Sequence, residues 1–257
     1  GFRPICKAGN PGERIMAAWL PPGLVMPIQY LRRLTSRERT EDANRRLGQS
    51  LAFVAGAANA GGFLAVKQYT SHMSGIVSAM ADDLVLGDIV LVLGGVASLL
   101  AFLCGAACTA VLVNWGRRRN TQSEFALPLM LEAGLLLCFG LMGASLDQFR
   151  VVFVPATVAL LCFMMGLQNA IITKISRAEI RTTHVTGLAT DIGIEIGKAL
   201  YWNHGHRNLP AVVANRPKLR LLSSLLAMFF VGGVTGALGF KHVGYVATIP
   251  LASILML

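Results

Sequence analysis

The sequence predicts an all-α, polytopic helical membrane protein with about six transmembrane helices and two short half-helices. Hydrophobic residues make up 54% of its 257 residues and charged residues only 14%, about half the charged share of an average soluble domain. The mean hydropathy is +0.59, and most of the 27 glycines lie in apolar runs, as in membrane helices. This composition excludes a disordered chain, and the spans lack the polar–apolar alternation of a lipid-facing barrel.

The predicted spans follow the apolar runs, because a membrane helix needs about 20 apolar residues. Segments 72–84 and 184–199 have a helical pattern but are short and carry acids, so we interpret them as half-helices or re-entrant segments. The six spans are expected at about 49–66, 86–114, 125–146, 151–173, 220–240 and 242–257.

Residues 1–48 form a basic, proline-containing segment, which we expect in the cytoplasm before two membrane repeats, 49–146 and 151–257. Residues 1–25 are interpreted as a disordered extension or as a stretch outside the native protein. With the N-terminus inside, twenty Lys and Arg residues face the cytoplasm and three face the other side. The positive-inside rule then predicts six spans with both termini cytoplasmic. Because the basic residues lie in connecting segments, we expect the lipid bilayer and no nucleic acid as a partner.

Two motifs occur twice. Residues 53–60, Phe-x-x-Gly-x-x-Asn-Ala, recur at 163–170, and the Ser-His-Met-Ser-Gly run that opens 71–78 recurs as Thr-His-Val-Thr-Gly in 183–190. An acid follows each motif histidine at the same distance, eleven residues on. Three spans per half is an odd number, so the second half enters the membrane from the opposite side. Such inverted repeats are typical of secondary transporters; if 72–84 crossed fully, the repeat would be parallel.

Four segments carry a family resemblance. They are Gly-x-x-Asn-Ala in the first span, Ser-His-Met-Ser-Gly at 71–75, Gly-Leu-Gln-Asn-Ala at 166–170, and Arg-Thr-Thr-x-Val-Thr-Gly at 181–187. Together they resemble the YoaK-like family of uncharacterised bacterial inner-membrane proteins, over about residues 48–257. The sequence departs from the family pattern at Asn59, where aspartate is usual, and at Ile76, where asparagine is usual. The resemblance implies a multi-pass protein of the bacterial inner membrane.

The repeated motifs supply the predicted substrate-binding residues. An amide within an apolar run is costly unless it has a partner, so each asparagine either coordinates substrate or makes a helix–helix hydrogen bond. Each His-hydroxyl-Gly segment opens a short helix, where Ser71 or Thr183 would act as N-cap and the helix N-terminus would favour an anionic ligand; the alternative is capping and close packing through the glycines. The predicted set is Asn59, His72, Ser74, Gly75, Gln168, Asn169, His184, Thr186, Gly187, Asp191 and Glu195.

Two acidic positions extend this prediction. In segment 184–199 the acids Asp191 and Glu195 share a face with His184, which either lines a polar cavity or lies in water on the membrane surface. Glu132 lies in the middle of a span, where an ionisable group indicates proton relay or cation pairing. We interpret Glu132 as the coupling residue; a structural pair with another helix is the alternative.

The function favoured by these patterns is a small secondary transporter or permease with a site between the two Asn/His motifs, for an unidentified small molecule or ion. The first alternative is a non-transporting scaffold or assembly module. The second is a lipid-acting intramembrane enzyme with His184, Asp191 and Glu195 as acid–base groups. No hydrolase, nucleotide-binding or zinc-protease motif is present in the sequence, so we expect no catalytic residues, metal or cofactor. Small-residue pairs such as Gly94-Gly95 leave a homo-oligomer open.

Overall fold

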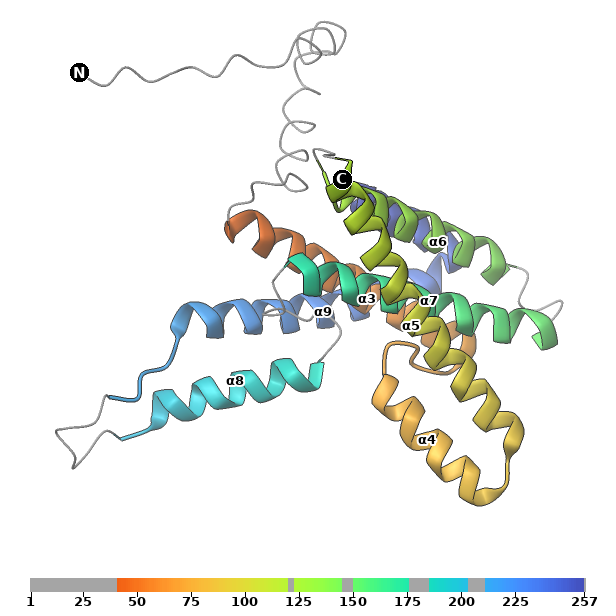
Figure 1. Cartoon of the computed structure of the whole chain (residues 1–257), viewed down its shortest axis with the longest axis horizontal. Coiled ribbons are helices and arrows are strands. Elements are labelled where there is room, and N and C mark those ends of the chain that lie inside the picture. Colours follow the sequence, from red (N-terminus) through yellow and green to blue (C-terminus); the bar gives the residue numbers. More distant parts are fainter. Residues whose placement is uncertain (1–40, 120–122, 145–149, 176–184, 203–210, 257) are drawn as a thin grey trace, which may run out of the picture.

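The computed structural model describes residues 41–119, 123–144, 150–175, 185–202 and 211–256 (Figure 1). All regular secondary structure in these residues is helical, and the long helices cross in one bundle. In chain order the elements are α3 (Glu41–Val66), α4 (Met73–Leu86), α5 (Ile89–Arg118), α6 (Ala126–Ala144), α7 (Arg150–Ile175), α8 (Val185–Leu200), α9 (Arg216–His242), the 3₁₀ turn η1 (Gly244–Ala247) and α10 (Thr248–Met256).

Five helices in the described residues, α3, α5, α6, α7 and α9, are long and apolar enough to cross a membrane. The predicted fold class, an all-α polytopic membrane protein, is thereby confirmed. The predicted span 242–257 differs in form, because it is a 3₁₀ turn followed by the nine-residue α10. Gly244, with φ at 70°, lies just after the end of α9 in a conformation that favours glycine.

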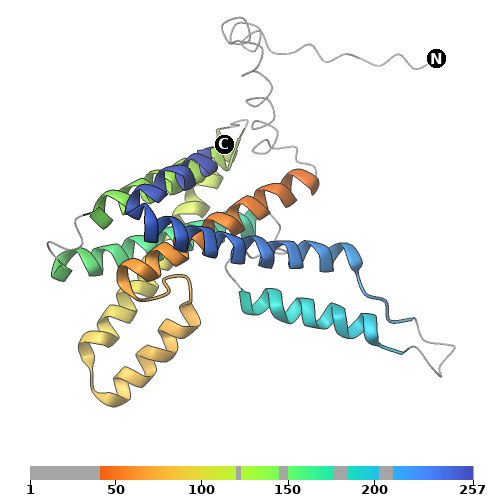
Figure 2. The same ribbon diagram turned by 180° about the vertical axis from the view of Figure 1, so that it is seen from behind.

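The two short helices form hairpins with the long helices that follow them. Gly87, at φ 80°, ends the 14-residue α4, and Asp88 begins α5 by accepting a hydrogen bond from the Leu91 N–H at 3.2 Å. Asn215 caps α9 in the same way, accepting from the Lys218 N–H at 3.0 Å. The α4–α5 and α8–α9 hairpins project from different sides of the bundle (Figures 1 and 2).

The two helices that carry the Phe-x-x-Gly-x-x-Asn-Ala motif, α3 and α7, run antiparallel. Gln168 of α7 donates from Nε2 to the carbonyl oxygen of Leu51 at 3.1 Å. Further along α3, Gly62 lies against Leu161, near the middle of α7. Residues 51–62 and 161–172 also show the same succession of buried and partly exposed positions.

Each motif helix is joined by a parallel partner from the other half of the chain. Helix α9 runs alongside α3 in the same direction. The amide of Gln49 donates to Ser224 at 2.9 Å and, toward the other end of both helices, the Phe240 ring covers Gly61. Helix α5 runs alongside α7 in the same direction. Its contacts there include a hydrogen bond from Thr109 to the carbonyl of Leu167 at 2.9 Å.

Both parallel pairs cross at reciprocal glycine contacts, in which each helix places a glycine on the carbonyl oxygen of a phenylalanine in the other. A methyl group at any of these glycines would overlap that oxygen, so the backbones meet only because side chains are absent. The small residues Gly105 and Gly232 thus make close contacts within this chain. The pairs are Gly56 with Phe229 and Gly232 with Phe53 between α3 and α9, and Gly166 with Phe102 and Gly105 with Phe163 between α5 and α7.

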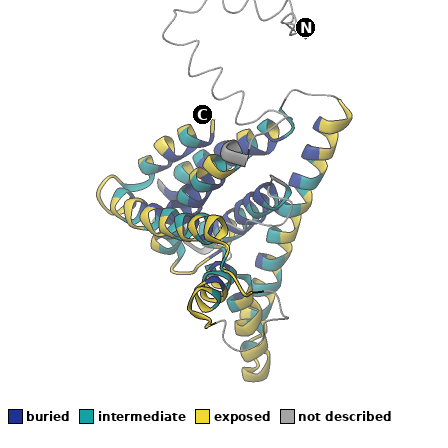
Figure 3. Ribbon diagram, turned by 90° about the vertical axis from the view of Figure 1, so that its left-hand side faces the viewer, coloured by how far each residue is buried: buried dark blue, intermediate teal, exposed yellow. Residues whose placement is uncertain are grey.

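Burial follows this arrangement (Figure 3). The buried residues gather along the inner faces of α3, α6 and α7, whereas the α4–α5 hairpin exposes large apolar side chains such as Val85 and Leu86. Apolar side chains on the outside of a membrane bundle meet lipid, which is as apolar as they are. The core is therefore held together by close packing of the helices, and not by the removal of apolar side chains from water.

The helix directions gather the basic helix ends at one end of the bundle. The starts of α3 and α9 lie together with the ends of α5 and α7, because the pairs run parallel and α3 opposes α7. The basic residues at this end are Arg45, Arg46, Arg117, Arg118, Arg119, Lys174, Arg216, Lys218 and Arg220.

The glycine crossings generate a first prediction. Gly56→Val and Gly166→Val should each destabilise the protein by about 1–3 kcal/mol or more, because the added side chain meets backbone that cannot move aside. Thermal unfolding in detergent measures this loss. Gly134→Val is the matched control, since nothing lies within 4 Å of a methyl group there; equal losses in all three variants would contradict the role of the crossings.

Candidate functional site

A cavity of about 540 Å³ lies between α4, α5 and α7. Its lining is mostly apolar and includes Ile76, Leu91 and Val158. A cavity of this size suits a small organic molecule, with a few polar groups to orient it. The polar side chains of the lining are those of Gln68, Tyr69, His72, Asp83 and Ser98.

Small residues open this space. Nothing lies within 4 Å of a methyl group built on Gly94, whereas Met80 covers the neighbouring Gly95. On α4, the His72 ring lies over Gly75, with Nδ1 only 2.7 Å from where a Cβ would be. Gly75 therefore sets the position of the imidazole at the edge of the cavity.

The predicted N-cap of α4 is wrong. Ser71 does not cap the helix but donates from Oγ to Oδ1 of Asn59 at 2.9 Å, so that Asn59 links α3 to the segment before α4. His72 is the N-cap residue, and its side chain makes no capping hydrogen bond. The physical reason is that α4 begins at Met73, so that the N-cap position falls on His72 and not on Ser71. Thr183, the second predicted cap, lies outside the described residues.

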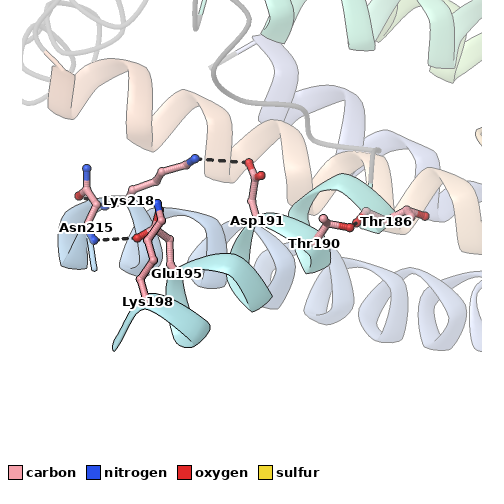
Figure 4. A network of polar contacts seen from close by, with 7 residues as sticks. All are labelled: Thr186, Thr190, Asp191, Glu195, Lys198, Asn215 and Lys218. Carbon is pink, nitrogen blue, oxygen red and sulfur yellow. Dashed lines mark hydrogen bonds and ion pairs between the residues drawn. The ribbon is translucent and has the colours of Figure 1, made fainter. Parts of the chain in front are cut away.

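The second hairpin uses its polar residues differently (Figure 4). Glu195 of α8 is only 2% exposed; it accepts from Lys198 Nζ at 2.9 Å and from the Asn215 N–H at 2.7 Å. Asp191 pairs with Lys218 at 3.6 Å. The polar face of α8 is thus turned toward the start of α9. The hydrogen bond from Lys198, and then that from Asn215, lower the pKa of the Glu195 carboxyl below its usual value.

The structure brings only part of the predicted site together. His72 and Gly75 line the cavity, while Ser74 is exposed on α4 beside it. Asn59 does not line it, and His184 lies outside the described residues.

The remaining predicted residues do not line the cavity. Gln168 is buried between α7 and α3, its Oε1 without a partner in the part of the chain that the structure describes. The carbonyl of Asn169 accepts from Thr173, and that of Thr186 from Thr190. Gly187 is half-buried on α8.

Sequence reasoning missed four polar lining residues, Gln68, Tyr69, Asp83 and Ser98. A signal existed for Asp83, which follows its motif histidine at the same eleven-residue distance as Glu195. For Tyr69 and Ser98 the helix packing alone brings them to the cavity.

Glu132 is buried on α6, with 1% of its surface exposed. Its Oε2 has no hydrogen-bond partner among the described residues, so the structural pair considered above is not formed by that atom. Glu132 does not line the cavity; α6 packs mainly on α7 and α10. Within the described ranges no three His, Cys, Asp or Glu side chains are grouped to hold a metal ion.

The contacts of Glu195 predict a pH-dependent stability. A carboxyl whose pKa is lowered by folding stabilises the protein above the unfolded-state value, about 4.3, and loses this contribution as the pH falls through the folded value. Glu195→Gln should therefore lower the unfolding midpoint at neutral pH, with the difference from wild type shrinking in acid. Chemical unfolding across pH measures this. Glu124→Gln, which removes the surface pair with Arg117, is the control; a difference for Glu195→Gln that stays constant with pH would refute the assignment.

Comparison with known proteins agrees with a membrane bundle of this kind. The family model described as "Protein of unknown function (DUF1275)" matches residues 47–257, which is consistent with the YoaK-like resemblance. The UPF0700 transmembrane protein RA0705 of Rhizobium meliloti (strain 1021) is 27% identical over 233 residues, covering 90% of this chain and 92% of that protein. No solved structure matches. Because the family model covers most of the sequence, the chain belongs to the DUF1275 family.

Proposed function

We propose that this protein is a small permease of the bacterial inner membrane, with its substrate site in the cavity between α4, α5 and α7. The observation that carries the proposal is the cavity itself. It is apolar with a few polar groups, and it contains His72 and Gly75 of the first repeated motif. A pure scaffold has no need for such a space in an otherwise closely packed bundle.

The helix arrangement supports an inverted repeat. The motif helices α3 and α7 are antiparallel, and each crosses a parallel partner through the same reciprocal Phe–Gly contact. Inverted repeats allow one half of a transporter to rock against the other and so expose a site to each side in turn. The cavity would then be the site in one of these two states.

The charge distribution supports an orientation. The end of the bundle that gathers the basic residues would face the cytoplasm, by the positive-inside rule. The lining residues of α5, between Val90 and Ser98, lie near the start of that helix, away from its basic end. The cavity would therefore lie toward the extracytoplasmic side.

The contacts of the acidic residues weigh against the lipid-acting enzyme. Asp191 and Glu195 were its acid–base groups, and both are engaged by lysines. A general acid or base has to reach the substrate proton, which these contacts oppose. The scaffold is the alternative that an accessibility experiment separates from a permease.

Cysteine accessibility tests the permease without knowledge of its substrate. In a cysteine-free background, Ala79→Cys places a thiol in the cavity lining. A membrane-impermeant thiol reagent should label it from outside in intact cells and also from inside in inverted vesicles, because alternating access opens the cavity to both sides.

The matched control is Leu86→Cys, at the exposed end of the same helix. It should react from the outside only. Labelling of Ala79→Cys from one side only, as with this control, would reject the permease and favour the scaffold.

Glu132 is proposed as the coupling residue, because a buried carboxyl in a membrane helix changes the charge of its surroundings when it binds a proton. Glu132→Gln keeps the shape and removes this change. We expect the ratio of inside to outside labelling of Ala79→Cys to depend on pH in the parent protein and to become independent of pH in Glu132→Gln. The unfolding midpoint serves as the folding control, and an unchanged pH dependence would exclude Glu132 as the coupling residue.

A further inference from the structure

The acids Asp83 and Glu195 occupy matching places in the two hairpins. Each lies eleven residues after its motif position, 72 or 184. Each lies on a short helix that packs against the long helix after it, α4 on α5 and α8 on α9. The second hairpin therefore shows what kind of group a carboxylate at this place binds.

In the second hairpin that group is an ammonium from the chain itself. Lys198 donates to Glu195 at 2.9 Å. A second ammonium, from Lys218, pairs with Asp191 one turn away. The carboxylate of Glu195 is thus fully engaged although it is almost inaccessible to water.

The first hairpin has the acid without the ammonium. The repeat offset of 112 places Leu86 at the position of Lys198, and the offset of 127 between Gly105 and Gly232 places Leu91 at that of Lys218. Asp83 lines the cavity, and its carboxylate makes no hydrogen bond or ion pair within the described ranges. No lysine or arginine is among the residues that line this cavity.

The first hairpin also has space where the second is filled. By the same offset of 127, Leu221, Leu222 and Leu225 stand where α5 has Gly94, Gly95 and Ser98. Leu221, at the position of Gly94, is partly buried and packs against the core, whereas a methyl group at Gly94 would meet nothing. The space at Gly94 and the absence of an ammonium near Asp83 thus both concern the α4–α5 hairpin.

We infer that the cavity binds a small organic amine, whose ammonium takes the place at Asp83 that Lys198 takes at Glu195. This inference rests on the proposed transport site and names its substrate class. A carboxylate and an ammonium form a strong, charge-assisted hydrogen bond away from water. The apolar lining would hold the hydrocarbon body of the amine, and the Tyr69 ring offers a π-face to the cation.

Three ligands of similar size and different charge test this inference on the purified full chain in detergent. Isothermal titration calorimetry is carried out with 2-phenylethylamine, 2-phenylethanol and 3-phenylpropanoate. We expect the amine to bind about tenfold or more tightly than the alcohol, since only the amine provides an ionic partner. No binding is expected for the carboxylate.

Matched variants test whether amine binding depends on the Asp83 carboxylate and on the space at Gly94. Asp83→Asn should weaken amine binding about tenfold or more and leave binding of the alcohol unchanged, because only the charge pair is lost. Asp82→Asn is the control, an exposed acid on the same helix that does not line the cavity; it should bind the amine as wild type does. Gly94→Leu, which copies the leucine of the second half, should lose both the amine and the alcohol and still elute as a folded protein.

Several results would overturn the inference. They are equal affinity for amine and alcohol in the wild type, no amine binding in the wild type, and equal losses in Asp82→Asn and Asp83→Asn. The ligand comparison needs no variant, so a folding defect in Asp83→Asn leaves the test intact. Two-sided labelling of Ala79→Cys without amine binding would refute the substrate class alone, whereas Asp83-dependent amine binding with one-sided labelling would refute the permease alone.

Discussion

The structure depends on the contact of glycine with a backbone carbonyl where α3 crosses α9 and α5 crosses α7. In a bilayer, burial of apolar side chains does not drive helices together, so close backbone approach and the dispersion and weak Cα–H···O contacts it allows have to hold the bundle. Each crossing joins a helix of one half to a helix of the other. The two halves are therefore interlocked, and neither has a complete set of contacts without its partner.

The α4–α5 and α8–α9 hairpins differ in the charged and the bulky side chains that they carry. The α8–α9 hairpin encloses a buried carboxylate by supplying Lys198 and the Asn215 N–H, and it fills the adjoining space with leucines. The α4–α5 hairpin keeps the carboxylate of Asp83 but has glycine and leucine at the corresponding places. The α8–α9 hairpin thus neutralises its acids with lysines of the chain, whereas the α4–α5 hairpin contributes Asp83 to a cavity.

Much of this architecture could be predicted because it rests on local patterns. Length and hydropathy identify the long spans and set apart the short segments 72–84 and 184–199, which we interpret as half-helices or re-entrant segments. The matched motifs identify equivalent helices. Capping was less predictable. Helix α4 begins at Met73, so the N-cap position falls on His72, and the Ser71 hydroxyl donates to Asn59 of another helix, a contact that a short stretch of sequence does not reveal.

The sequence by itself determined the membrane class and the places of the five long apolar helices, because composition and periodicity act over short stretches of chain. Only the tertiary structure decided which of the repeated polar residues share a space. It left Asn59 outside the cavity that His72 lines, brought Tyr69, Asp83 and Ser98 to that cavity, and engaged Asp191 and Glu195 with lysines. The reason is physical: which side chains meet depends on where α5 crosses α7 and where α8 meets α9, and these crossings are set by contacts between residues far apart in the chain.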